Sequence, residues 1–198
     1  MTDIQDAKFD PTLAEKASQR PVLADGTYAF LITNAARETL ERGKLAGVRA
    51  ARTFLTPVKD LTNPHASLAK QYSVPYSLFL PITKEDGTNP PTWITQKANR
   101  ELNALFGDEV PRAPYPKSET ERQSAREAFM ATGAKAEELW NMKDATGGYV
   151  DDMGLRNHLV FATIKNNTKD GKTYANVDGE LMSDIPEGIA LASPTAAD

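Results

Sequence analysis

The stretch HLVFATIKNNTKDGKTYANVD, residues 158–178, decides the fold of this chain. Residues 158–166 are rich in apolar, aromatic and β-branched side chains, which is typical of a β-strand. Asp170-Gly171 is a strong signal for the tight turn of a β-hairpin. Residues 172–178 follow the turn and predict the partner strand, so the second half of the chain should contain an antiparallel hairpin.

Three more strands are predicted before this hairpin, at residues 27–36, 48–56 and 72–82. We expect Pro57 to close the second of them. Strict alternation of polar and apolar side chains fails at Ala50-Ala51, which would suit a β-bulge. Pro75 and Pro81 cannot donate to a ladder, so the third strand should be an edge strand or an irregular one.

Helical patterns occupy the segment between the third and fourth strands. Thr92 is expected to cap a helix over 93–106, with Gly107 just past its end. Ser118 and Glu121 have the spacing of a capping box for a helix over 119–132, which Gly133 should stop. A further short helix is predicted over 134–143.

The resulting order is three strands, helices, then two strands. This is a mainly β, α+β arrangement with the layout of an OB-fold, a five-stranded Greek-key barrel with its helices between strands 3 and 4. We expect one domain over residues 21–182 with a helical insert at about 83–153. Residues 1–20 are interpreted as a flexible arm, and residues 183–198 as an acidic flexible tail.

Composition excludes several classes of protein. The chain has 198 residues, of which 40% are hydrophobic and 25% charged, so it can bury a core and is not globally disordered. It has no cysteine, which removes disulfides, thiolate zinc sites and thiol nucleophiles. Its start is polar and acidic, unlike a signal peptide, and no apolar run is long enough to span a bilayer. A cytoplasmic protein without a membrane partner is expected, in a cell or an infected host.

The residues of common active sites are scarce. The two histidines, His65 and His158, both have ordinary structural interpretations, and paired acids such as Asp151-Asp152 are interpreted as solvated charge. Gly171-Lys172-Thr173 resembles the end of a phosphate-binding loop, but Asn166 stands where that motif needs a glycine. We therefore predict no enzyme activity, no metal site and no cofactor.

Charge is unevenly distributed along the chain, although the net charge is only −4. Residues 37–59 hold six basic and two acidic side chains, and residues 156–174 hold four and one. Residues 107–152 hold ten acidic and six basic side chains, and no basic residue follows Lys172. This segregation could form a local positive face, or it could be ordinary solvated surface charge.

Basic strands with scattered aromatic residues suit single-stranded nucleic acid. Lysine and arginine release counterions from phosphates, and an aromatic ring can stack on any base. The candidate binding residues lie on the first two strands with their connection, on the third strand and on the final hairpin: Arg37, Lys44, Arg49, Arg52, Lys59, Tyr72, Tyr76, Lys165, Lys169, Lys172 and Tyr174.

Several of these assignments have competing interpretations. Arg49 and Arg52 share a face only if the bulge between them exists. Tyr76 and Tyr174 suit surface stacking and structural burial equally well. The phenylalanines among aliphatic residues are expected in the core, and Trp93 is expected to pack on the barrel; these phenylalanines are Phe54, Phe79 and Phe161.

The chain resembles the OB-fold single-stranded DNA-binding proteins encoded by bacteriophages. The resemblance lies in the opening strand Leu23–Tyr28, the helix Asn99–Asn103 and the closing segment Lys165–Gly179. It implies coating of single-stranded DNA during phage replication or recombination. It also implies contacts with replication or recombination proteins through the acidic C-terminal region, where residues 183–186 are distantly similar to the acidic tip of bacterial counterparts but internal and without a terminal Phe.

Two other functions remain open. The chain could be a non-enzymatic phage structural or scaffolding protein that docks through its helical insert. A nucleic-acid-processing enzyme is the third alternative, and the scarcity of metal ligands and nucleophiles disfavours it. A homo-oligomer is compatible with each of these interpretations.

Overall fold

The computed structural model of the chain describes residues 22–41, 43–63, 68 and 73–184. The expected arm at 1–20, Tyr72, His65 and the part of the expected tail after residue 184 lie outside these described residues.

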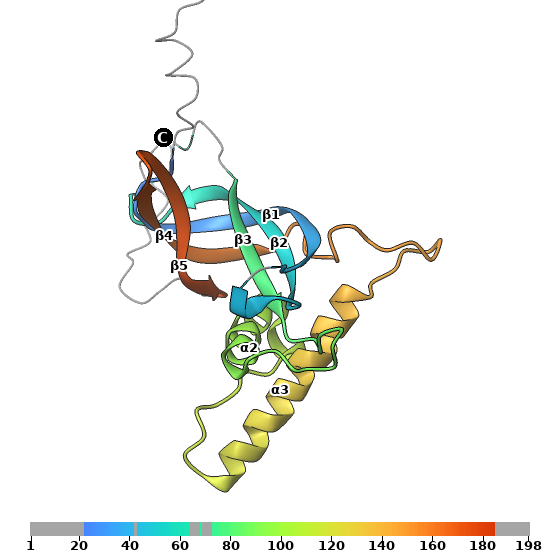
Figure 1. Ribbon diagram of the computed structural model, residues 1–198. Coiled ribbons are helices and arrows are strands. Elements are labelled where there is room, and N and C mark those ends of the chain that lie inside the picture. Colours follow the sequence, from blue (N-terminus) through green and yellow to red (C-terminus); the bar gives the residue numbers. More distant parts are fainter. Residues whose placement is uncertain (1–21, 42, 64–67, 69–72, 185–198) are drawn as a thin grey trace, which may run out of the picture.

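Five strands form one antiparallel sheet in the order β3-β2-β1-β4-β5 (Figure 1). They are β1 (Gly26–Thr39), β2 (Arg49–Asp60), β3 (Val74–Leu80), β4 (Leu159–Lys169) and β5 (Lys172–Met182). The five predicted strands are therefore confirmed, each with shifted bounds. β3 ends the strand order as expected, and Pro75 is exposed on it, where no ladder partner needs its missing N–H.

The predicted bulge at Ala50-Ala51 is wrong. β2 pairs without interruption with both neighbours over this stretch, and the irregularities lie at Ala29/Phe30 and between Ile32 and Asn34. Both alanines are fully buried, so β2 is covered on both faces there and need not alternate. β2 also continues through Pro57, which sits at one of the register shifts, where a missing donor is tolerated.

Two helices lie between β3 and β4: α2 (Thr92–Phe106) and α3 (Glu119–Trp140), with the 3₁₀ turn η2 (Gly107–Glu109) between them. A second 3₁₀ turn, η1 (Gly43–Leu45), lies between β1 and β2. The capping box at Ser118 is confirmed, since its hydroxyl accepts from the Glu121 N–H and the Glu121 carboxylate accepts from the Ser118 N–H. Thr92 does not cap α2, because Pro91 precedes the helix and no side-chain cap forms.

The predicted stop at Gly133 is also wrong. α3 continues through this glycine to Trp140, so the two helices expected over 119–132 and 134–143 are one. Thr132 and Ala136 on either side of Gly133 are fully buried. This packing offsets the cost of a mid-helix glycine, about 1 kcal/mol relative to alanine.

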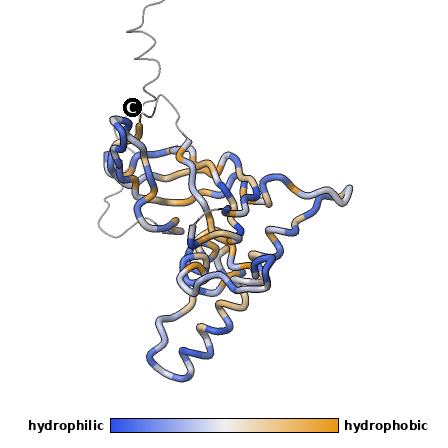
Figure 2. The backbone as a smooth tube through the Cα atoms, in the orientation of Figure 1, coloured by the Kyte–Doolittle hydropathy of each residue, from blue (hydrophilic) through white to orange (hydrophobic). Residues whose placement is uncertain are grey.

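The core lies between the inner face of the sheet and the helical layer. Its largest fully buried side chains come from β1, β2, β3, α2, α3 and the segments that follow β3 and precede β4: Tyr28, Phe30, Ile32, Leu55, Leu78, Leu80, Ile82, Ile94, Leu102, Leu139, Met153 and Leu155. α3 extends away from the sheet, and its far half is coloured hydrophilic in Figure 2. Within the described part of the chain, no helix combines the length and apolarity that crossing a bilayer requires.

Candidate nucleic-acid interface

The β4–β5 hairpin gathers four of the predicted binding residues. Its turn is Asp170-Gly171, with φ of 52° and 71°, the left-handed conformations of a type I′ turn. Lys169 pairs with Lys172, and Tyr174 pairs with Asn167. Since paired and alternate residues share one face, Lys165, Lys169, Lys172 and Tyr174 point to the same side of the hairpin. We call this surface the hairpin face.

The opposite side of the hairpin belongs to the core. Ile164 is buried, and Val177 and Ala175 pack against the core cluster. The four residues of the hairpin face are all exposed, and 51% of the surface of Tyr174 is accessible to solvent. The register is thus fixed by apolar burial on one side, which forces the lysines to the other.

The lysines of the hairpin face have no acidic partner within the part of the chain that the structure describes. None of the ion pairs among the described residues involves Lys165, Lys169 or Lys172. Asp178 lies on the same side, at the pair with Thr163, farther from the turn. Like charges directly opposite one another destabilise a sheet by a few tenths of a kcal/mol up to about 1 kcal/mol, so Lys169 and Lys172 favour a bound anion between them.

Arg52 and Lys59 lie on the outward face of β2, the side of the sheet away from the core. Arg52 is paired with Ser77 and forms an exposed ion pair with Glu38 at 3.4 Å. Lys59 is exposed and pairs with Ala29. These two residues share the outward face with the hairpin lysines, because side chains keep their side across neighbouring strands.

Arg49 lies on the opposite, inner face, because no bulge reverses the alternation between it and Arg52. Its guanidinium stands 5.2 Å from the centre of the Trp140 ring, at the end of α3. Arg49 and Arg52 therefore do not form one binding stripe, and Tyr76 does not join them on the outward face.

Arg37 also lies on the inner face and holds the segment that follows α3. Its guanidinium donates to the carbonyl oxygens of Trp140 at 2.8 Å, Val150 at 2.7 Å and Met142 at 3.4 Å. It also stands 4.9 Å from the centre of the Tyr149 ring. These contacts occupy the guanidinium N–H groups that a phosphate would need, so Arg37 has a structural role. Lys44 is exposed in the turn η1.

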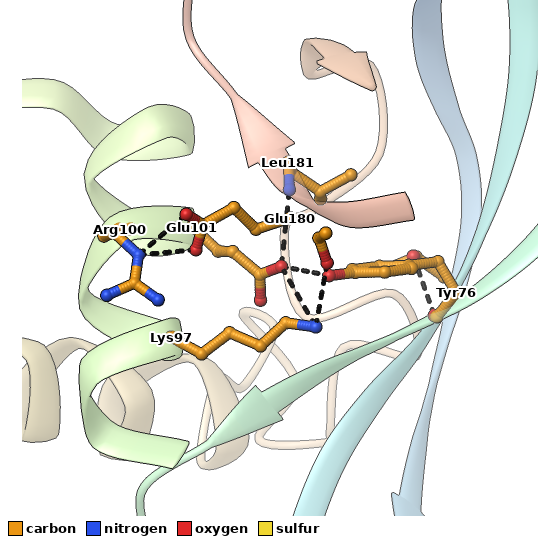
Figure 3. A network of polar contacts seen from close by, with 8 residues as sticks. Tyr76, Lys97, Arg100, Glu101, Glu180 and Leu181 are labelled. Atoms are coloured by element: carbon orange, nitrogen blue, oxygen red, sulfur yellow. Dashed lines mark hydrogen bonds and ion pairs between the residues drawn. The ribbon is translucent and has the colours of Figure 1, made fainter. Parts of the chain in front are cut away.

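Tyr76 points into the protein, toward α2 (Figure 3). Its hydroxyl donates to the carboxylate of Glu101, and the same carboxylate oxygen accepts from the backbone N–H of Leu181 at 3.3 Å. Lys97 stands 3.9 Å from that oxygen. Glu101 thus links β3 to β5 from a fully buried position, and Tyr76 serves this link rather than a surface platform.

Burial dominates the electrostatics of this link. It raises the pKa of Glu101 to about 7, although the Tyr76 hydroxyl, Lys97 and the Leu181 N–H all favour the carboxylate. Burial together with the neighbouring Glu101 raises the pKa of Tyr76 above its ordinary value. The second Glu101 oxygen is buried and has no hydrogen-bond partner among the described residues.

The expectation that Phe54, Phe79 and Phe161 lie in the core is wrong. All three are only partly buried, and the registers place them on the outward face. Phe54 lies two residues after Arg52 and therefore on the same face of β2, so strict alternation along β2 was the signal that could have found it. Phe161 likewise alternates with the buried Val160 and Ala162.

Trp93 is an aromatic residue that sequence reasoning assigned to packing alone. Its ring contacts Phe79 edge to face at 5.7 Å, which agrees with packing, yet 46% of its surface stays exposed. Lys97 stands 5.6 Å from the centre of the Phe79 ring. The outward side of β2–β3 thus carries Arg52, Phe54 and Phe79, with Trp93 beside them.

His158 and Asp152, which were considered for catalysis or metal binding, make structural contacts. His158 stacks edge to face on Phe106, and its ring nitrogen lies 3.2 Å from the Leu155 carbonyl. Asp152 pairs with Arg156. No group of three histidine, cysteine or acidic side chains within the described ranges could hold a metal ion.

Comparison with known proteins adds no relative: neither a protein-family model nor a curated protein matches the chain. The functional argument therefore depends on the geometry described above.

Proposed function

We propose that this chain is a non-catalytic protein that binds single-stranded DNA with little sequence preference through its hairpin face. The chemistry is that of other single-strand binders: lysines pair with successive phosphates, and an exposed ring stacks on a base. Tyr174 supplies the ring, and Lys165, Lys169 and Lys172 supply the charges.

The observation that carries the proposal is the direct pairing of Lys169 with Lys172. Two exposed cations held opposite each other, with no acid paired to either among the described residues, cost folding energy unless an anion lies between them. A phosphate backbone supplies such anions at regular intervals.

The fold that accompanies this function is a Greek-key barrel of the OB type. Two observations support it: the sheet order β3-β2-β1-β4-β5, and the buried Glu101 that draws β3 and β5 together through Tyr76 and Leu181. In such barrels the outward side of strands 2 and 3 contributes to binding. Arg52, Phe54 and Phe79 would then extend the hairpin face.

The corresponding biological role is the coating of single-stranded DNA during phage replication or recombination in the host cytoplasm. The resemblance of the opening strand, the α2 helix and the closing hairpin to phage single-stranded DNA-binding proteins supports this role. Recruitment of replication or recombination proteins by the acidic C-terminal region belongs to the same proposal.

A fluorescence anisotropy titration with a fluorescein-labelled oligo-dT tests the binding. At low salt the protein should bind the oligo-dT more tightly than a duplex of equal length. The double variant Lys169→Glu/Lys172→Glu should lose most of this affinity. The matched variant Lys117→Glu/Arg126→Glu changes the charge equally at exposed sites elsewhere and should keep it. Absence of oligo-dT binding by the wild type would refute the proposal.

The second candidate is a non-enzymatic phage structural or scaffolding protein that docks through its helical insert. A groove between α2 and α3, lined in part by Pro114, Tyr115 and Phe129, favours a docking role.

A further inference from the structure

β5 is an edge strand, and part of its edge is open. Within the described part of the chain it pairs only with β4, at the end of the strand order. α2 covers the last residues of β5, since Lys97 Nζ donates to the Gly179 carbonyl at 3.2 Å. The N–H of Leu181 also donates to Glu101 of this helix, at 3.3 Å. The open edge therefore consists of residues 172–178.

This open edge lacks the features that usually keep strands from pairing with other chains. Its central residues 173–177, with the sequence TYANV, contain no proline and no charged side chain. Pairing with β4 runs without a bulge from Lys172 to Asp178. Ala175 and Val177 are half-buried, and the other residues of the open edge are exposed. An exposed edge of this kind is a template for another strand.

The hairpin register determines which backbone groups face the open edge. Lys169 and Lys172 flank a two-residue turn, so they share its hydrogen bond. Bonded and non-bonded pairs alternate along an antiparallel ladder, so every second residue of β5, counted from Lys172, bonds to β4. The N–H and C=O groups of Thr173, Ala175 and Val177 therefore point away from β4.

The open edge is complementary to a second copy of itself. Two such edges can meet antiparallel about a two-fold axis at Ala175. Thr173 then lies opposite Val177 of the second copy, so the outward N–H and C=O groups find partners. The same register places Lys172 opposite Asp178 of the second copy, and the two-fold axis repeats this pair of opposite charges at the other end of the interface.

Neighbouring registers fit less well. Sliding one strand by two residues toward the turns places Lys172 opposite Asn176, so the pairing of opposite charges is lost. Sliding it by two residues the other way places Thr173 opposite Gly179, whose carbonyl is bonded to Lys97 of α2. A slide by one residue sets outward backbone groups against inward ones. Only the register centred on Ala175 uses the whole open edge.

We propose that two copies of this chain form a two-fold dimer by pairing residues 172–178 of β5, so that one sheet runs through both. One short pair of strands is a small interface, so association is weak and depends on protein concentration. Figure 1 places the connection between α2 and α3 at the end of the molecule opposite the hairpin tip, which leaves room for the second copy. The dimer does not require DNA binding at the hairpin face.

Sedimentation velocity of the full chain at low salt tests this pairing. The wild type should change from monomer to mainly dimer as its concentration rises to about 0.5 mM. Lys172→Asp and Asp178→Lys each set like charges opposite one another at both ends of the interface, so each should weaken association by about tenfold. An equimolar mixture of the two variants restores opposite charges at both ends and should associate like the wild type.

Matched variants control for charge and for folding. Lys117→Asp and Asp151→Lys make the same charge changes at exposed positions outside β5 and should leave association unchanged. Ala175→Pro removes an N–H that points to the open edge and not to β4, so it should abolish association. Circular dichroism should show that this variant keeps its fold. Recovery in the mixture also separates charge from folding, because misfolded variants could not recover.

Three results would overturn the dimer: a wild type that stays monomeric at about 0.5 mM, single variants that associate like the wild type, or a mixture that does not recover. A wild type that dimerises and recovers in this way without binding oligo-dT would support the dimer and refute the DNA proposal alone.

Discussion

Lys169 and Lys172 face each other directly across the β4–β5 ladder, next to the Asp170-Gly171 turn. The turn fixes this pair, because a two-residue type I′ loop allows only one register of the flanking strands. Apolar burial of Ile164 and Val177 on the other side keeps both lysines in solvent. Repulsion between the two lysines destabilises the unbound protein, and an anion bound between them would offset this repulsion.

Replacing one of these lysines should separate stability from function. Lys172→Ala removes the repulsion, so we expect the free energy of unfolding at low salt to stay level or rise by about 0.2–1 kcal/mol. Oligo-dT affinity should fall at the same time. Denaturant unfolding and anisotropy measure the two effects. Lys117→Ala is the control, and a marked loss of stability in Lys172→Ala would count against the repulsion argument.

Tyr174 should contribute through its ring. Tyr174→Ala should weaken oligo-dT binding by about 1–3 kcal/mol, the usual cost of losing one stacked base, whereas Tyr174→Phe should retain most of it. Tyr149→Ala serves as the comparison, because Tyr149 is similarly exposed, at 58%, but belongs to the segment after α3. Equal losses in the Tyr174 and Tyr149 variants would show that neither ring is specific to the site.

Arg37 should matter for structure and not for binding. A lysine cannot reach the three carbonyls that the guanidinium joins, so Arg37→Lys should lower the free energy of unfolding by about 1.5–3 kcal/mol. Amide hydrogen exchange should become faster in residues 140–150. Oligo-dT affinity should not change, and a selective loss of affinity without loss of stability would place Arg37 in the interface after all.

Glu101 should make stability depend on pH. Its pKa is raised to about 7 in the folded protein, so between about pH 4.5 and pH 7 the folded state keeps a proton that the unfolded state has released. The stability that this proton provides is present at low pH and is lost as the pH rises through 7. The variant Glu101→Gln has no titratable group at this position, so it should lack this pH dependence of stability.

The measurement for Glu101 is the difference in unfolding free energy between wild type and Glu101→Gln across this pH range. We expect the wild type to lose stability relative to the variant as the pH rises from about 4.5 to 7. Tyr76→Phe, which removes the hydroxyl donor that favours the carboxylate, should destabilise the protein and extend this loss to higher pH. A difference that does not vary with pH would contradict the burial argument.

Local signals in the sequence predicted the hairpin and the capping box at Ser118, since each depends on neighbouring residues. The continuity of α3 through Gly133 and the absence of a bulge at Ala50-Ala51 could not be predicted. Both depend on what covers these positions in the folded chain: packing around Gly133, and burial of both faces of β2.

Only the part of the candidate site whose geometry is determined by a single pair of strands could be predicted from the sequence. The hairpin face follows from alternation around one turn. The inward positions of Arg37 and Tyr76 depend on partners 103 and 25 positions away, respectively, which no local pattern reveals. The outward position of Phe54 could have been predicted, because a residue two positions after the exposed Arg52 lies on the same face of a strand.

The salt dependence of oligo-dT binding tests the central claim most directly. For the wild type the logarithm of the association constant should fall linearly with the logarithm of salt concentration, by about 0.7 per phosphate contacted. Lys169→Ala/Lys172→Ala should bind more weakly at low salt and show a slope shallower by about 1.4, the share of two contacts. A wild type that does not bind at low salt, or a double variant with an unchanged slope, would contradict the account.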